Sequence, residues 1–284
     1  MYRSTTVAAV SLKPAKWDKA GNADKLEAFF TRAAGAEPRP ELIVAPEGVL
    51  EGYVVHQVLQ QPERGEAMLA LAEPIDGPYI RRFQQLARRL GTCLCFGFAE
   101  RIGDEIYGSA VFVDHDGVIR GKHHKMQFGT GTHQSWFCNR EGQALRAFDT
   151  PLGRVGIVIC NDRRSPLLVG TLVLDGARLI LIPAYGARTR EQNLVVLARA
   201  RENGVPIVQA NVGMNLIVSK GEVVAYKWGT DQVTAAVIDI PEPPSTSAAR
   251  RAEQEYLDAR GPLMARRYQQ WLRRTQALDD AASD

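Results

Sequence analysis

Three side chains able to take part in covalent hydrolysis each follow a predicted strand, and the first is Cys160. It ends the apolar run 155–160, and a short polar segment that starts at Asn161 separates it from a helical segment. A thiol at such a strand-to-helix turn faces the positive end of a helix, which lowers a thiol pKa. The adjacent Asn161 amide can point at an oxyanion formed on a substrate. Taken alone, a cysteine at a strand end is more often simply buried.

A carboxylate and an ammonium occupy equivalent places elsewhere in the chain. Glu47 comes directly after the apolar strand 41–45, and Lys125 lies just beyond the strand 118–122. Carboxyl ends of strands are where α/β sheets gather functional groups, although either residue alone could be a solvated turn residue. Together, a base, a cation and a thiol supply what the hydrolysis of an unreactive amide or ureido carbonyl needs.

The elements that must position these residues alternate along the chain. Helices are predicted where apolar residues recur at helical spacing: 20–34, 77–90, 167–175 and 189–203. Strands are predicted over twelve shorter runs: 6–12, 41–45, 92–100, 105–114, 118–122, 146–149, 154–159, 178–182, 206–210, 215–218, 223–227 and 234–240. A strand-rich middle with flanking helices predicts an α/β fold, a four-layer α-β-β-α sandwich of two packed mixed sheets with outer helices.

The 284 residues are expected to form one large domain over 1–241 and a linker with a helical tail over 242–284. The tail is expected to pack on its own or a partner subunit, with a surface for an acidic partner as the alternative. A net charge of +3 argues against a nucleic-acid module, and no apolar run is long enough to cross a membrane. The start of the chain lacks a signal peptide pattern, and four cysteines suggest no disulfide framework, so a cytoplasmic location is expected.

Read together, three blocks of sequence resemble the signatures of the nitrilase (carbon–nitrogen hydrolase) superfamily over residues 6–240. The blocks are Ala45-Pro46-Glu47-Gly48, Gly121-Lys122-His123-His124-Lys125 and Gly156-Ile157-Val158-Ile159-Cys160-Asn161-Asp162-Arg163. The resemblance implies Glu47 as general base, Lys125 as the cation that stabilises the oxyanion and Cys160 as nucleophile. It also implies the α-β-β-α sandwich and a homodimer or larger homo-oligomer. No metal or other cofactor is required.

Within this superfamily, the run 160–166 is most similar to the N-carbamoyl-D-amino-acid hydrolases. That similarity implies that Arg163 and Arg164 bind a substrate carboxylate, which guanidinium groups do bidentately. The alternative is that one of the two arginines closes an internal ion pair. His133 matches a histidine of the same branch and could contact Lys125 or substrate.

The chain also departs from the family pattern. Ser165 and Leu167 replace a tryptophan and a glutamate of the carbamoylase branch, so the pocket wall beside the nucleophile differs. Most members have a second glutamate between the lysine and cysteine blocks, where this chain has Ser135. Without that carboxylate, Lys125 has less to orient it, and its pKa is expected to be lowered in an apolar pocket.

These residues predict a hydrolase of small-molecule amide or N-carbamoyl substrates that forms a thioester and releases ammonia. Two alternatives stay open. One is a nitrilase that acts on a C≡N bond with the same three residues. The other is a binding or scaffold member with weak catalysis, because Ser135 stands in the second glutamate's place.

Overall fold

The computed structural model describes residues 2–128, 139–186, 189–243 and scattered positions within 251–273. The chain divides into two units, Met1–Glu242 and Pro243–Asp284. In the second unit the described residues from Arg251 onward, such as Tyr268, have helical backbone. The packing of this tail stays a prediction. None of the helices within the described ranges is both long enough and apolar enough to span a bilayer.

Two six-stranded sheets form the framework of the first unit. In spatial order, the first sheet contains β12 (Gln232–Pro241), β1 (Tyr2–Ser11), β2 (Leu42–Val44), β3 (Cys93–Ile102), β4 (Glu105–Val113) and β5 (Ile119–His124). The second contains β11 (Glu222–Trp228), β10 (Met214–Ser219), β9 (Ile207–Asn211), β8 (Leu179–Ala184), β7 (Gly153–Ile157) and β6 (Phe148–Thr150). In each sheet three central strands run parallel and the remaining neighbours are antiparallel. Both sheets are therefore mixed, as the sequence predicts.

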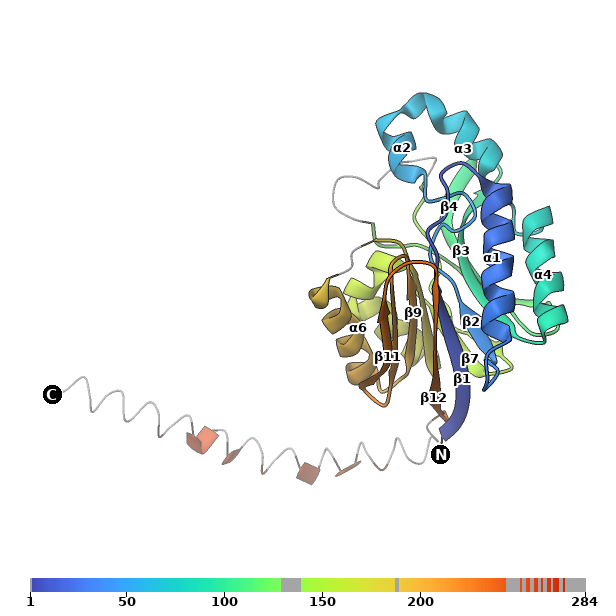
Figure 1. Cartoon of the computed structure of the whole chain (residues 1–284). Helices are drawn as coiled ribbons and strands as arrows, with labels where there is room; N and C mark the ends of the chain where they lie inside the picture. Colours follow the sequence, from blue (N-terminus) through green and yellow to red (C-terminus); the bar gives the residue numbers. More distant parts are fainter. Residues whose placement is uncertain are drawn as a thin grey trace. The chain divides into compact units, whose positions relative to one another are not determined.

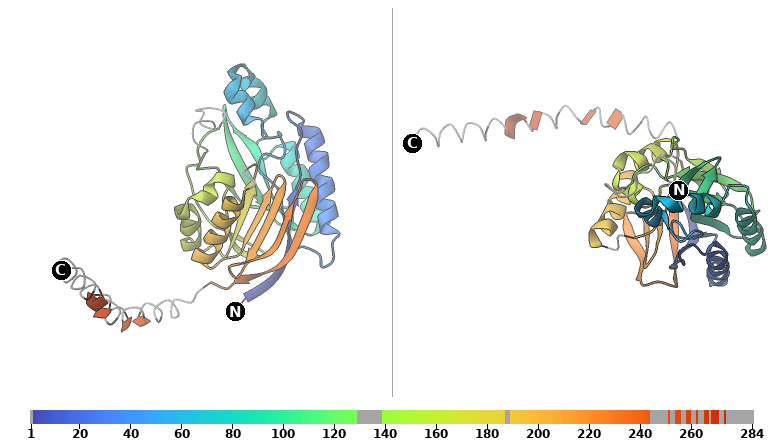
Figure 2. Two further views of the ribbon diagram at one scale, coloured as in Figure 1. Left: turned by 60° about the vertical axis from the view of Figure 1, so that its left-hand side comes forward. Right: turned by 90° about the horizontal axis from the view of Figure 1, so that it is seen from above.

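Helices cover the outer face of each sheet (Figures 1 and 2). α1 (Lys19–Ala34) and α4 (Pro78–Leu90) pack on the first sheet, and α5 (Pro166–Leu174) and α6 (Arg190–Asn203) pack on the second. A third apolar cluster lies between the two sheets. The predicted α-β-β-α sandwich is confirmed.

β1 shows why the central strands are apolar on both faces. Val7 and Ala9 belong to the cluster between the sheets, whereas Ala8 and Val10 belong to the cluster under α1 and α4. Successive side chains of a strand point to opposite faces, and here both faces are covered. Because the central strands are buried on both sides, functional groups are confined to their ends.

The segment between β2 and α4 holds helices that the sequence did not predict. These are α2 (Val55–Gln60), a 3₁₀ turn (Pro62–Arg64) and α3 (Gly65–Leu71). α2 and α3 have no side-chain cap and only six and seven residues, too few to be stable alone. They form because they pack in a separate apolar cluster with Tyr53.

Candidate active site

Glu47 lies on a tight turn directly after β2, and the backbone of β3 fixes this turn. The Val49 N–H donates to the Gly97 carbonyl at 3.1 Å, and the Gly97 N–H donates to the Pro46 carbonyl at 3.0 Å. A Cβ on Gly97 would lie 2.6 Å from the Cα of Glu47. Glycine at position 97 therefore lets the turn pack directly on the strand, and this contact sets the depth of the Glu47 side chain.

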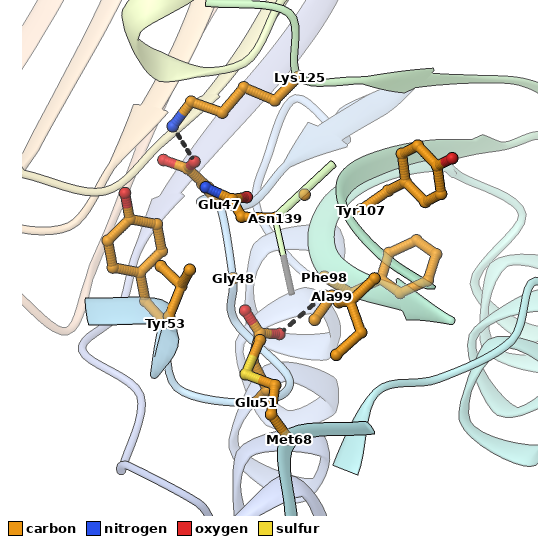
Figure 3. Close-up of a pocket in the computed structure, with 13 residues that line it drawn as sticks. Glu47, Gly48, Glu51, Tyr53, Met68, Phe98, Ala99, Tyr107, Lys125 and Asn139 are labelled. Carbon is orange, nitrogen blue, oxygen red and sulfur yellow. Dashed lines mark hydrogen bonds and ion pairs between the residues drawn. The ribbon is translucent and has the colours of Figure 1, made fainter. Parts of the chain in front are cut away.

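Lys125 follows β5 and points to Glu47 (Figure 3). Its backbone N–H donates to the Gly108 carbonyl at 2.8 Å, and its own carbonyl accepts from the Gly142 N–H at 2.9 Å. Its Nζ donates to Oε1 of Glu47 at 2.6 Å, and both side chains are buried. The base and the cation predicted from sequence thus form one buried ion pair.

Cys160 begins the 3₁₀ turn Cys160–Arg164 with a φ of +47°. Residues with a side chain seldom adopt this left-handed conformation, so the surrounding contacts must hold it. Asp162 supplies several of them. Its Oδ2 accepts from the Ile159 N–H at 2.9 Å and lies 2.9 Å from Nε2 of His123.

Asp162 also ties the cysteine turn to the lysine segment. Its Oδ1 accepts from the N–H groups of Met126 and Gln127, at 3.1 and 2.6 Å. Together with His123, these residues flank Lys125 on both sides in the sequence. One fully buried carboxylate therefore fixes the Cys160 turn, which follows the second sheet, relative to Lys125, which follows the first.

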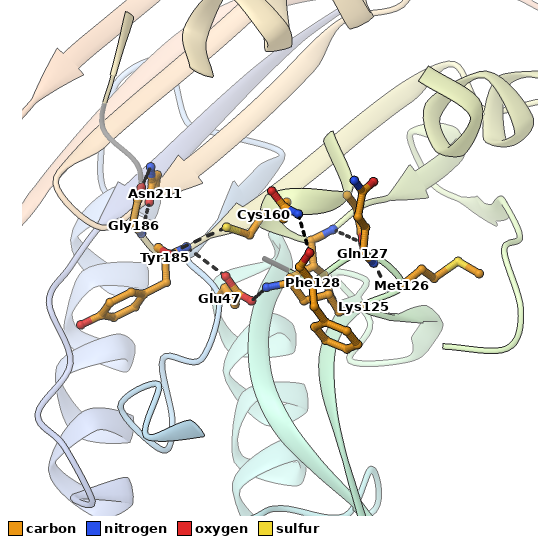
Figure 4. Close-up of polar contacts among 12 residues, drawn as sticks. Glu47, Lys125, Met126, Gln127, Phe128, Cys160, Tyr185, Gly186 and Asn211 are labelled. Atoms are coloured by element: carbon orange, nitrogen blue, oxygen red, sulfur yellow. Dashed lines mark hydrogen bonds and ion pairs between the residues drawn. The ribbon is translucent and has the colours of Figure 1, made fainter. Parts of the chain in front are cut away.

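The peptide groups of Tyr185 join the base to the thiol (Figure 4). The Tyr185 N–H donates to Oε2 of Glu47 at 3.1 Å, and the Cys160 thiol donates to the Tyr185 carbonyl at 3.8 Å. Asn211 steadies the same segment, because its side chain bonds both the N–H and the carbonyl of Gly186. Glu47, Lys125 and Cys160 thus gather at one place where the two sheets meet.

The electrostatics favour a neutral thiol beside an ion pair. Burial and the negative charge of Glu47 raise the pKa of Cys160, while Lys125, Arg163 and the contact with Tyr185 lower it, with a net increase. For Lys125, burial alone would lower the pKa, but the negative charge of Glu47 and the negative forms of neighbouring groups raise it overall. The lowered pKa expected for Lys125 is therefore wrong, because the expectation left out its contact with Glu47.

The sequence of the first unit matches a known protein family. The family model of carbon–nitrogen hydrolases covers residues 6–241. The chain belongs to the carbon–nitrogen hydrolase family. This confirms the resemblance carried by the three sequence blocks. The family accounts for nearly all of the first unit.

Curated relatives in this family have several activities. A protein from Pseudomonas protegens described as a hydrolase is 30% identical over 213 residues, covering 74% of this chain and 70% of that protein. A probable nitrilase from Schizosaccharomyces pombe is 26% identical over 211 residues, covering 72% and 73%. An N-carbamoylputrescine amidase from Oryza sativa is 31% identical over 150 residues, about half of each chain (51% and 48%).

Solved structures of carbon–nitrogen hydrolases share the fold. Nit3 of Saccharomyces cerevisiae, a member of the nitrilase superfamily, matches with a TM-score of 0.72 at 22% identity, over 84% of this chain and 90% of that one. An amidase from Nesterenkonia sp. matches with a TM-score of 0.69 at 20% identity, over 87% and 95%. The two structures support the four-layer architecture of the first unit.

The residues predicted to bind substrate have different surroundings. The side-chain amide of Asn161 donates to the Phe128 carbonyl at 3.0 Å, and Arg164 is exposed. His133 and Ser135 lie outside the described residues. The part of the chain that the structure describes contains no group of three or more His, Cys, Asp and Glu side chains arranged to hold a metal ion.

Arg163 is 1% exposed and lies inside the protein. Its Nε donates to Oε1 of Gln192 at 3.1 Å, and its Nη1 donates to Oε1 of Gln209 at 2.9 Å. A substrate carboxylate does not reach a guanidinium so enclosed. The structure therefore favours an internal role for this arginine over the expected binding of a carboxylate. Its partners are two glutamine amides, whereas the alternative prediction is an internal ion pair.

Sequence reasoning gave no role to Asp162, and for Tyr185 it considered only a side chain lining the pocket, with burial elsewhere as the alternative. Asp162 stands within the cysteine block, but nothing in the sequence shows that it reaches the lysine segment. Tyr185 directly follows the apolar strand β8, the same kind of position that identified Glu47. Its contribution comes from backbone atoms, which residue type does not reveal.

Proposed function

We propose that this carbon–nitrogen hydrolase cleaves the C–N bond of small amide or N-carbamoyl substrates through a thioester on Cys160. One observation carries the proposal. A single buried carboxylate, Glu47, accepts hydrogen bonds from both the Lys125 ammonium and the N–H of Tyr185. The carbonyl of Tyr185 in turn accepts a hydrogen bond from the Cys160 thiol. A base, a cation and a nucleophile so arranged are suited to acyl transfer.

In the first half-reaction, Glu47 takes the thiol proton as the sulfur of Cys160 attacks the carbonyl carbon. The carbonyl oxygen becomes an oxyanion, which the Lys125 ammonium and the main-chain N–H of Asn161 stabilise, each by about 3 kcal/mol. When the tetrahedral intermediate collapses, the C–N bond breaks and Glu47 returns the proton to the leaving nitrogen. The products are ammonia and the acyl-enzyme.

In the second half-reaction, Glu47 removes a proton from a water molecule as its oxygen attacks the thioester carbon. The C–S bond breaks, and the proton passes to the sulfur of Cys160, which restores the thiol. An amide yields a carboxylic acid. An N-carbamoyl compound yields a carbamic acid that decomposes to carbon dioxide and an amine.

The relatives guide the substrate class. Amidases and N-carbamoylputrescine amidases are among the proteins that this chain is similar to. In the proposal, Arg164 and His133 supply polar contacts to the substrate, whereas Arg163 acts from below the site as a buried positive charge. A homodimer or larger homo-oligomer and a cytoplasmic location stay predictions.

The test is ammonia release from a panel of N-carbamoyl amines, N-carbamoyl amino acids and simple amides. We expect at least one class of compound to be hydrolysed, and we expect Cys160→Ala to lower its rate of hydrolysis by about 10⁴-fold or more. Mass spectrometry of quenched reactions should show the acyl mass on the peptide that contains Cys160. Turnover that survives Cys160→Ala would overturn the thioester mechanism.

A nitrilase activity is the second candidate, because a relative is itself described as a probable nitrilase. The same thiol would then add to a C≡N carbon and form a thioimidate, which water converts to ammonia and a carboxylic acid. Adding nitriles to the panel distinguishes the two candidates. If no compound is turned over and iodoacetamide fails to alkylate Cys160, the binding or scaffold alternative is favoured.

A further inference from the structure

A second carboxyl group lies on the same turn as Glu47, four residues further along the chain. Glu51 is 5% exposed, and its Oε2 accepts from the Ala99 N–H at 2.9 Å. A Cβ on Gly48, which has a φ of +62°, would lie 2.7 Å from Oε1 of Glu51. Glycine at position 48 thus leaves room for this carboxyl beneath the base. No Lys, Arg or His of the described chain forms an ion pair with it.

Glu51 and the Glu47–Lys125 pair line one small cavity (Figure 3). Its volume is about 20 Å³, which is room for about one water molecule and too little for a substrate. Apolar side chains, among them Met68 and Phe98, close the wall around Glu51. A charge on Glu51 is therefore poorly screened and acts on its neighbours at low effective dielectric constant.

The titratable groups around Glu51 come from several elements. They are Glu47 and Tyr53 on its own turn, Lys16 in the loop before α1, Tyr107 on β4 and Lys125 after β5. Burial raises the pKa of Glu51 most, and the negative charge of Glu47 raises it further. Bonds from its own N–H and that of Ala99, and the charge of Lys16, lower it, which leaves a pKa of about 7.

We propose that Glu51 is a positioning residue of the hydrolase, whose ionised carboxylate favours proton transfer from Cys160 to Glu47. The inference rests on the proposed function. Before attack, the negative charge is on Glu47, and during attack it moves to the sulfur and then to the substrate oxygen. A negative charge on Glu51 repels the negative charge of Glu47. It therefore favours the transfer of negative charge from Glu47 to the sulfur and to the substrate oxygen beside Lys125.

The sign of the effect follows from this arrangement. Below about pH 6, Glu51 is protonated and neutral, and it resembles a glutamine. Above about pH 7.5 it is ionised and pushes negative charge away from Glu47. The plot of Cys160 reactivity against pH should therefore show an additional rise centred near pH 7, called here the Glu51 limb. The rise should be on the order of fivefold for one charge at this effective dielectric constant.

The experiment measures the rate at which iodoacetamide alkylates Cys160 from pH 5.5 to 9, followed by mass spectrometry of the peptide that contains it. It needs no substrate. The wild type is compared with Glu51→Gln, which keeps the side-chain shape. The control is Glu73→Gln, since Glu73 is also buried but pairs with Lys19 and accepts from the Tyr79 N–H.

We expect Glu51→Gln to react about fivefold more slowly than wild type above pH 7.5 and at the same rate below pH 6. Glu73→Gln should keep the wild-type profile. Equal rates at every pH, or a slower rate by the same factor at every pH, would overturn the inference, since a purely structural role has no such pH dependence.

A second variant tests the role of the Glu51 carboxyl by removing a nearby positive charge, that of Lys16. Lys16 is exposed, so Lys16→Gln is expected to fold, and loss of its charge should move the limb to higher pH by a few tenths of a unit. A limb that stays in place would contradict the assignment to Glu51. Glu47→Gln separates the two proposals. If it leaves alkylation unchanged, the proposed base is wrong, whereas an effect of Glu47→Gln without one of Glu51→Gln overturns only the inference.

Discussion

The Glu47 turn (residues 45–53) in the first sheet and the Cys160 turn (residues 159–165) in the second are built by different means. The Glu47 turn collects charge, because it pairs one carboxylate with Lys125 and buries a second, Glu51, beneath it. The Cys160 turn instead fixes geometry. It holds a neutral thiol in a left-handed conformation and anchors it with the internal hydrogen bonds of Asp162.

The difference shows that the two sheets contribute different groups to the site. In the proposed mechanism, the first sheet supplies the groups that move a proton and stabilise negative charge, and the second supplies the sulfur that attacks the substrate. The Tyr185 backbone connects the two turns, because it bonds both Glu47 and Cys160, and Asp162 connects the Cys160 turn to the segment that carries Lys125. Substitutions can therefore perturb each turn separately, and we expect them to have different effects on activity and stability.

Apart from loss of the Cys160 thiol itself, the largest expected effect comes from breaking the charge pair of the first sheet. Glu47→Gln and Lys125→Met should each lower kcat by about 10³-fold. Each should also destabilise the fold by about 3–5 kcal/mol, because it leaves one buried charge without a partner.

The double variant tests whether the pair acts as one unit. It should lose little more activity than the worse single variant and recover part of the stability, because no lone charge remains. Ammonia release and urea unfolding measure the two quantities. Multiplicative losses in the double variant would show that the two side chains act independently.

The next effect comes from loosening the Cys160 turn. Asp162→Asn keeps one acceptor but loses the charge that faces His123 and two N–H groups of the lysine segment. We expect kcat to fall by about 10- to 100-fold and stability by about 2–3 kcal/mol. The control is Asp175→Asn. Asp175 directly follows α5, and its carboxylate also accepts a backbone hydrogen bond, from the Ala147 N–H, but it contacts none of the three candidate catalytic residues. A loss of activity in the control would show that general loosening is responsible.

The buried charge of the Glu47 turn should also make stability depend on pH. The pKa of Glu51 is about 7 when folded and near 4.5 when unfolded, so between these values the folded state holds a proton that the unfolded state has released. Rising pH therefore costs stability, up to about 3 kcal/mol above pH 7.

Glu51→Gln should remove this cost. The variant should be more stable than wild type at pH 8 by as much as about 3 kcal/mol and differ little from it near pH 4. Urea unfolding at the two pH values provides the measurement. A wild type that gains stability relative to the variant as pH rises would contradict the sign.

The smallest expected effects come from single methyl groups. Gly97→Ala places a Cβ 2.6 Å from Cα of Glu47, which should cost about 1–3 kcal/mol and displace the base. Gly170→Ala in α5 meets Asn203 at an ordinary 3.8 Å and should stabilise the helix by about 0.5–1 kcal/mol. Thermal unfolding of both variants checks the pair. A neutral Gly97→Ala would mean that the Glu47 turn is more adaptable than the packing indicates.

Much of this framework could be predicted because it depends on local patterns. Apolar runs identified the strands, and helical periodicity identified α1, α4, α5 and α6. The short helices α2 and α3 were missed, because they depend on packing against Tyr53 and its neighbours. The two arginines after Cys160 show the same limit, since adjacent residues of one type have opposite surroundings, Arg163 buried and Arg164 exposed.

The sequence by itself determined the family, the layers of the fold and the three candidate catalytic side chains, because each depends on residue type and on its place beside a strand. Only the tertiary structure decided that Glu51 lies beneath Glu47, that the Tyr185 backbone bonds both Glu47 and Cys160, and that Asp162 links the Cys160 turn to the lysine segment. These are contacts between segments far apart in the chain, or made by backbone atoms. Their existence depends on how the two sheets pack, which no local pattern encodes.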